Sequence, residues 1–123
     1  MANPNIVNVT SILGKTLQAA LTTTLTTELL ANAAASGLVY KINQILVANI
    51  DGTDAADASI LITKSGGSPI AIASTISIPA DATLAVIDKN TSFYLEEGDN
   101  IEGGASADND LVITISYEII SSS

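Results

Sequence analysis

The chain has 123 residues, 47% of them hydrophobic, which is enough for one domain with a modest core and too apolar for a disordered segment. Its 13 acidic residues outnumber four lysines and give a net charge of −9, so we expect neither nucleic acid nor an anionic membrane surface as a partner. Cysteine is absent, which excludes disulfides and thiolate metal sites. We expect a single domain over residues 1–123, with loose terminal arms at 1–5 and 121–123.

Residues 1–5 lack the basic start and the apolar run of a secretory leader, so we expect no signal peptide. No stretch approaches the roughly 18 consecutive apolar residues that a membrane-spanning helix needs. These features predict a soluble protein that is made in the cytoplasm.

The first patterned segment, residues 16–30, fits two kinds of structure. Its leucines recur every fourth residue, which suits one face of a helix and equally one face of a strand. The β-branched threonines between them disfavour a helix, so we favour a strand and keep the helix as the alternative. A loop over residues 31–37 is expected to follow. The leucines are Leu17, Leu21, Leu25 and Leu29.

Alternation of apolar and polar residues then predicts most of the remaining strands. Longer strands are expected over residues 38–50, 70–78 and 111–120, and shorter ones over 58–64, 83–88 and 92–95. In the first long strand one face is expected to carry Leu38, Tyr40, Ile42, Leu46, Ala48 and Ile50. In the second the shared face is Ile70, Ile72, Ser74, Ile76 and Ile78, and in the third it is Leu111, Ile113, Ile115, Tyr117 and Ile119.

Turn-forming residues separate these strands at short intervals. Turns are expected at residues 51–54, 65–69, 79–81, 97–100, 103–104 and 108–110. Short strands with so many turns are typical of a sandwich or a barrel. We therefore predict an all-β protein, an antiparallel β-sandwich.

The residues offer little material for catalysis. Histidine and cysteine are absent, so a Ser-His-Asp triad and a cysteine nucleophile are impossible, and the four lysines lie in no recognisable motif. The pairs Gly66-Gly67 and Gly103-Gly104 do not follow the phosphate-loop pattern and are interpreted as turns. We expect no enzymatic activity, no catalytic or cofactor-binding residue and no cofactor.

Calcium is the strongest ligand hypothesis that the sequence offers, because it binds hard oxygen ligands from flexible loops. One acidic loop carries Asp51, Asp54 and Asp57, and a second carries Glu96, Glu97, Asp99 and Glu102. Neither matches the EF-hand pattern, and Asp favours turns for its own local hydrogen bonds. We therefore assign no metal ligand. Tyr40 and Tyr117 lie on apolar strand faces and are expected to pack in the core rather than to bind sugar.

Several segments taken together resemble small virion structural proteins, of decoration or cement type, of tailed phages that infect marine bacteria and cyanobacteria. They are MANPNIV at 1–7, VYKIN at 39–43, NIDGT at 49–53, IPADATL at 78–84 and YLEEGD at 94–99. The pattern Leu95-x-x-Gly-Asp-x-Ile, followed by a loop and a long alternating strand, is similar to the end of many jelly-roll domains, which often form trimers.

The resemblance implies a structural component of the virion. We expect a capsid decoration (cement) protein that binds the outside of the head shell, contacts the major capsid protein and forms a homo-oligomer, with a trimer favoured. Its negative charge suits an outer surface, away from packaged DNA. Two alternatives remain open: a tail or adhesion component that contacts a host receptor, and a free-standing ligand-binding β domain.

Overall fold

A computed structural model describes residues 9–122, which form nine strands and no helix. The strands are β1 (Val9–Ala20), β2 (Glu28–Ala31), β3 (Leu38–Asn49), β4 (Ala56–Thr63), β5 (Ile70–Ile78), β6 (Thr83–Ile87), β7 (Phe93–Leu95), β8 (Asn100–Ala105) and β9 (Leu111–Ser122). The described part of the chain has no helix long and apolar enough to cross a membrane.

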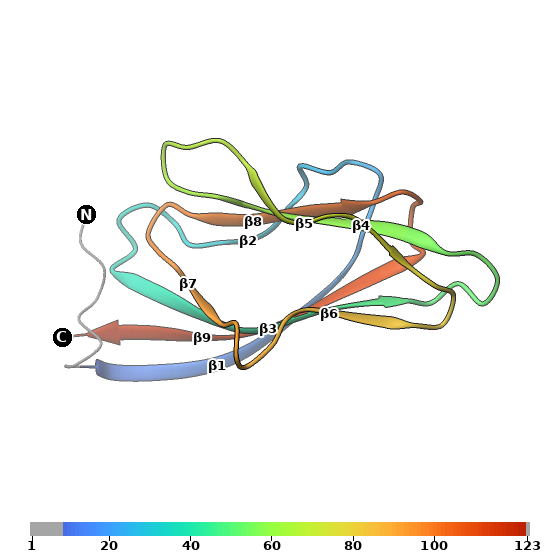
Figure 1. Cartoon of the computed structure of the whole chain (residues 1–123). Helices are drawn as coiled ribbons and strands as arrows, with labels where there is room; N and C mark the ends of the chain where they lie inside the picture. The colour runs from blue at the N-terminus through green and yellow to red at the C-terminus, as the bar shows by residue number, and fades with distance from the viewer. Residues whose placement is uncertain (1–8, 123) are drawn as a thin grey trace.

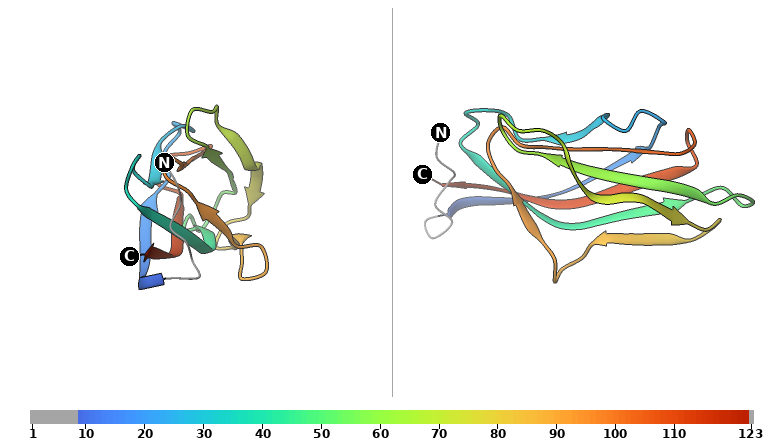
Figure 2. Two further views of the ribbon diagram at one scale, coloured as in Figure 1. Left: turned by 90° about the vertical axis from the view of Figure 1, so that its left-hand side faces the viewer. Right: turned by 45° about the horizontal axis from the view of Figure 1, so that its top comes forward.

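Two antiparallel sheets pack face to face, which confirms the predicted β-sandwich (Figure 1). One sheet has the order β1-β9-β3-β6, with the short β7 also paired to β3. The other has the order β2-β8-β4-β5. Strands β1 and β5 are therefore edge strands of different sheets, and they lie on opposite sides of the sandwich in the end-on view of Figure 2.

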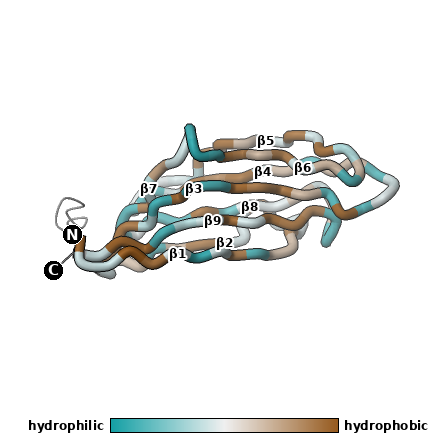
Figure 3. The backbone as a smooth tube through the Cα atoms, turned by 90° about the horizontal axis from the view of Figure 1, so that it is seen from below, coloured by the Kyte–Doolittle hydropathy of each residue, from teal (hydrophilic) through white to brown (hydrophobic). Residues whose placement is uncertain are grey.

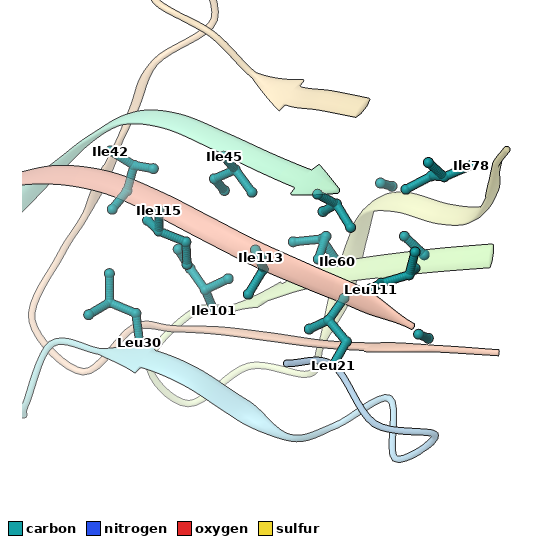
Figure 4. Close-up of a cluster of buried hydrophobic side chains, with 14 of the residues drawn as sticks. Leu21, Leu30, Ile42, Ile45, Ile60, Ile78, Ile101, Leu111, Ile113 and Ile115 are labelled. Carbon is teal, nitrogen blue, oxygen red and sulfur yellow. The ribbon is translucent and has the colours of Figure 1, made fainter. Parts of the chain in front are cut away.

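Aliphatic side chains from both sheets form the core between them (Figure 4). Strand β9 lies between β1 and β3, and the predicted alternation holds along it: Leu111, Ile113 and Ile115 are fully buried. Burying one such side chain contributes about 1.5–3 kcal/mol of transfer free energy. The face predicted for β9 is therefore confirmed.

The face predicted for β3 is wrong in its second half. A register shift between Ile42 and Gln44 places an extra residue in the strand, and this β-bulge exchanges the two faces. Ile45 and Val47 are fully buried as a result, whereas Leu46 is only half-buried on the opposite face. Simple alternation fails here because it assumes an unbroken pleat.

The apolar face predicted for β5 is also largely unburied. Only Ala73 and Ile78 of this strand are buried. The pairing of β5 with β4 shifts register twice, and Thr75 has a positive φ of 52° within one of these irregularities. As an edge strand, β5 has no further strand hydrogen-bonded to its outer side in the described part of the chain, which leaves its isoleucines partly uncovered.

The interpretation of Gly103-Gly104 as a turn is wrong, since both glycines lie inside β8. A Cβ on Gly104 would lie 2.8 Å from the carbonyl oxygens of Thr22 and Thr24 and 2.9 Å from the Cα of Leu25. The loop between β1 and β2 thus crosses directly over the β8 backbone. Glycine is needed here for close approach rather than for a turn.

Within residues 16–30 the strand interpretation holds at both ends, and no helix forms. Residues 16–20 complete β1 and residues 28–30 belong to β2, while residues 21–27 form the crossing loop. The structure also extends β1 back to Val9. The arm expected at 1–5 lies outside the described residues. Ser121 and Ser122 are part of β9, so the loose arm expected at 121–123 is wrong for these two residues.

Candidate functional site

Two carboxylates of the second acidic loop, those of Glu96 and Asp99, pair with a lysine of the protein itself. The Asp99 carboxylate is 2% exposed and lies 2.5 Å from the Lys64 Nζ, which is also 2.6 Å from the Glu96 Oε1. The backbone N–H groups of Ser65 and Glu96 donate to the two Asp99 oxygens at 3.0 and 2.9 Å. Asp99 therefore joins the β4–β5 hairpin to the β7–β8 turn, and its oxygens already have protein partners.

The same contacts shift the pKa of Lys64. Partial desolvation acts to lower the pKa of Lys64, but hydrogen bonds and charge interactions with Asp99 and Glu96 outweigh it and raise the pKa above its usual value of 10.5. Lys64 thus stays charged at neutral pH and serves as the counter-ion of Glu96 and Asp99.

The three aspartates of the first acidic loop do not all lie in one loop, as the sequence had suggested. Asp51 and Asp54 approach Asp110 at the end of the sandwich, whereas Asp57 lies on β4. Partial burial and the neighbouring Asp51 and Asp54 raise the pKa of Asp110 above its usual value. Across residues 9–122, no group of three or more acidic side chains has a geometry that could hold a metal ion.

The other buried polar side chains also connect loops. The Asn32 Nδ2 donates to the carbonyl oxygens of Leu38 and Leu95 at 2.9 and 3.1 Å. At the opposite end of β3, the Asn49 Nδ2 donates to the carbonyls of Asp54 and Ile78 at 3.0 and 2.9 Å. Such saturated contacts hold turns in place and leave these amides little capacity for a ligand.

A shallow, open depression of about 270 Å³ lies over the outer face of the β2-β8-β4-β5 sheet. Its lining includes Leu25, Asp57, Ser59 and Thr75. Ser59 is already engaged, because its Oγ accepts the Thr75 backbone N–H at 3.0 Å. The depression is open to solvent and lacks the enclosure that is typical of a small-molecule site.

Tyr40 and Tyr117 pack as a pair against the core. The rings of Tyr40 and Tyr117 stack with centroids 5.5 Å apart, and Tyr117 is buried. Burial, with a smaller contribution from Tyr40, raises the pKa of Tyr117. Core packing of this pair, as predicted, is therefore confirmed.

Exposed apolar side chains are the remaining candidates for function. On β5, Ile70 is 69% exposed and Ile72 and Ile76 are each 40% exposed. We call these three residues the β5 edge surface. Residues 65–80, which include all of β5, contain no charged residue, although the chain carries a net charge of −9. A neutral, isoleucine-rich edge on an acidic molecule has the character of a protein-binding surface.

The beginning of β1 is a second exposed apolar region. Ile12 is 57% exposed and Leu13 is 51% exposed. Both are paired with isoleucines of β9, Ile120 and Ile119, and the paired ends of β1 and β9 are coloured as hydrophobic in Figure 3. The alternation used to find strands misses this region, because its two large apolar residues are adjacent and fall on opposite faces.

No protein-family model matches the chain, and no curated protein is significantly similar to it. The surface chemistry of the described residues and the short motifs of the sequence are therefore the basis for assigning a function. Of those motifs, residues 39–43 lie in β3, residues 78–84 connect β5 to β6 and residues 94–99 lead from β7 towards β8, while residues 1–7 lie outside the described part.

Proposed function

We propose that this protein is a structural component of a tailed-phage virion, a decoration protein that binds the outside of the head shell and stabilises it. The observation that carries the proposal is the β5 edge surface, three exposed isoleucines in the uncharged run of residues 65–80, on a molecule of net charge −9. A decoration protein needs such a surface for its capsid partner. Its remaining acidic exterior faces solvent and disfavours contact with packaged DNA.

The sequence motifs support the same proposal independently of this surface. They resemble virion proteins in segments spread over the whole chain. Asn32, Asn49 and Asp99, the fully buried polar side chains, tie loops together and so have structural roles. What remains is a β-sandwich with a surface suited to packing against protein.

We further propose that the fold is a jelly roll. The strand order supports this when β6 and β7, which both pair with β3, are taken as one interrupted strand. Each sheet then has four strands, β1-β9-β3-β6 and β2-β8-β4-β5, as in double-sheet jelly rolls of viral proteins.

Binding to phage heads that lack the protein tests the proposed role of the β5 edge surface. The purified chain is expected to co-sediment with such heads, and Ile72→Asp is expected to abolish this binding, because it places a charge in the apolar contact. Ile50→Asp is the matched control, since Ile50 is 63% exposed but lies beyond the end of β3. Equal binding by both variants would contradict the assignment of this surface.

A further inference from the structure

Strand β1 is a long edge strand within the part of the chain that the structure describes. It pairs only with β9, in a regular antiparallel register from Ser11 to Ala20, and no other strand within residues 9–122 lies along its second side. Seven consecutive residues from Thr10 to Thr16 are exposed. A long edge with free backbone groups is a template for another strand.

Apolar side chains flank this edge on both faces. Leu13 pairs with Ile119 on the face towards the core, and Ile12 pairs with Ile120 on the outer face. A strand placed alongside β1 would therefore cover both exposed side chains at once. A partner that docked on one face alone would leave the other in water.

The distribution of charge favours a second copy of this chain as that partner. Residues 1–27 contain no acidic residue, and Lys15 is their only charged side chain. Two molecules that each carry a charge of −9 repel one another least if they approach through this region. The isolated lysine does not provide the basic patch that an acidic partner would require.

We propose that β1 pairs with β1 of a second copy in an antiparallel arrangement about a two-fold axis at Leu13. The pair would join the two β1-β9-β3-β6 sheets into one continuous sheet. A two-fold axis perpendicular to the sheet keeps each side chain on its own face. Leu13 then lies opposite its symmetry mate, Ile12 opposite Gly14 and Lys15 opposite Ser11.

This register fits the side chains better than its neighbours do. Gly14 has open space where a Cβ would stand, with no atom within 4 Å, so the partner's bulky Ile12 can occupy it. Centring the axis on Ile12 would instead place Leu13 against Ser11. Centring it on Gly14 would place Leu13 against Lys15. Only the register centred on Leu13 combines a leucine pair with an isoleucine over glycine.

The inference goes beyond the proposed virion role and does not depend on it. It also predicts a dimer in place of the trimer that the sequence resemblance favours. Light scattering after size exclusion is expected to give twice the chain mass of 12.5 kDa. Leu13→Lys is expected to return the mass to that of a monomer, because it places two like charges on the axis. Ile72→Lys, on the opposite edge, is expected to leave the dimer intact.

Cysteine cross-linking gives a second measurement that does not rely on disruptive variants. The chain has no cysteine, so Leu13→Cys introduces a single thiol per molecule. Directly paired residues have Cα atoms about 4.5–5.5 Å apart, which is within the range that a disulfide spans. Oxidation is expected to convert Leu13→Cys to a covalent dimer, while Ile72→Cys stays monomeric in a denaturing, non-reducing gel.

A monomeric or trimeric wild-type chain would overturn the proposal. So would a dimer that survives Leu13→Lys, or cross-linking of Ile72→Cys that equals that of Leu13→Cys. Circular dichroism of each variant shows whether the fold is retained, and Leu13→Cys decides the question if Leu13→Lys unfolds.

Discussion

The buried carboxylate of Asp99 offers a sharp test of how the loops at one end of the sandwich are held. Asp99→Asn keeps the size and shape of the side chain but removes its charge and replaces one acceptor oxygen with an NH₂ group. In the wild type Oδ1 accepts the backbone N–H of Ser65, and Oδ2 accepts both the backbone N–H of Glu96 and the Lys64 ammonium. Whichever way the asparagine amide turns, one backbone N–H then meets a donor.

The size of the effect follows from burial. Leaving a buried donor without an acceptor costs about 1–3 kcal/mol, and hydrogen bonds to a charged group contribute more than neutral ones. The Lys64 side chain is half exposed, so its ion pair is screened by solvent and contributes only about 0–1 kcal/mol. We expect Asp99→Asn to lower the free energy of unfolding by about 2–3 kcal/mol and Lys64→Met by at most about 1 kcal/mol.

Urea unfolding followed by circular dichroism measures this difference, provided that the slope of the transition is unchanged between variants. In thermal unfolding, 2–3 kcal/mol corresponds to a fall in Tm of roughly 6–15 °C for a domain of this size. If Lys64→Met destabilised the protein as much as Asp99→Asn, the ion pair rather than the backbone hydrogen bonds would hold the loops, and this reasoning would be refuted.

Three further perturbations test other parts of the structure. In the same urea assay, Gly104→Ala is expected to lower the free energy of unfolding by about 1–3 kcal/mol, because its Cβ would collide with the backbone of the crossing loop. Gly52→Ala is the control: its Cβ would meet only one atom, at 4.0 Å, so the free energy of unfolding is expected to change little. The raised pKa of Asp110 means that the folded protein binds a proton at this carboxylate more tightly than the unfolded chain does. The contribution of Asp110 to stability therefore falls as the pH rises above the unfolded value of 3.8. Urea midpoints should show Asp110→Asn more stable than the wild type at neutral pH, with the gain lost below pH 3.8. Ile113→Ala is expected to cost about 2–5 kcal/mol in calorimetry and Ile76→Ala much less, because only Ile113 is fully buried; equal losses would show that Ile76 belongs to the core.

The sequence predicts the strands that obey one uniform pattern. The alternation along β9 correctly identifies Ile113 and Ile115 as core residues. It fails in β3, where a bulge between Ile42 and Gln44 reverses the faces. A bulge leaves no clear mark in the sequence, because it depends on how a strand pairs with its neighbour.

Glycine and edge strands account for the other differences. Gly103 and Gly104 resemble a turn in sequence, and only the position of the loop above β8 explains them as strand residues. The exposure of Ile72 and Ile76 likewise follows from the place of β5 at the edge of a sheet, which is a property of topology. The uncharged run over residues 65–80 is the one sequence signal that marks this surface.

Immunogold electron microscopy of purified phage particles, with an antibody raised against this chain, tests the central claim most directly. A decoration protein is expected to give label spread over the surface of the head. Label confined to the tail would instead indicate a role in tail assembly or host contact. Unlabelled particles from infected cells in which a blot still detects the protein would contradict a virion role altogether and favour a free-standing β domain.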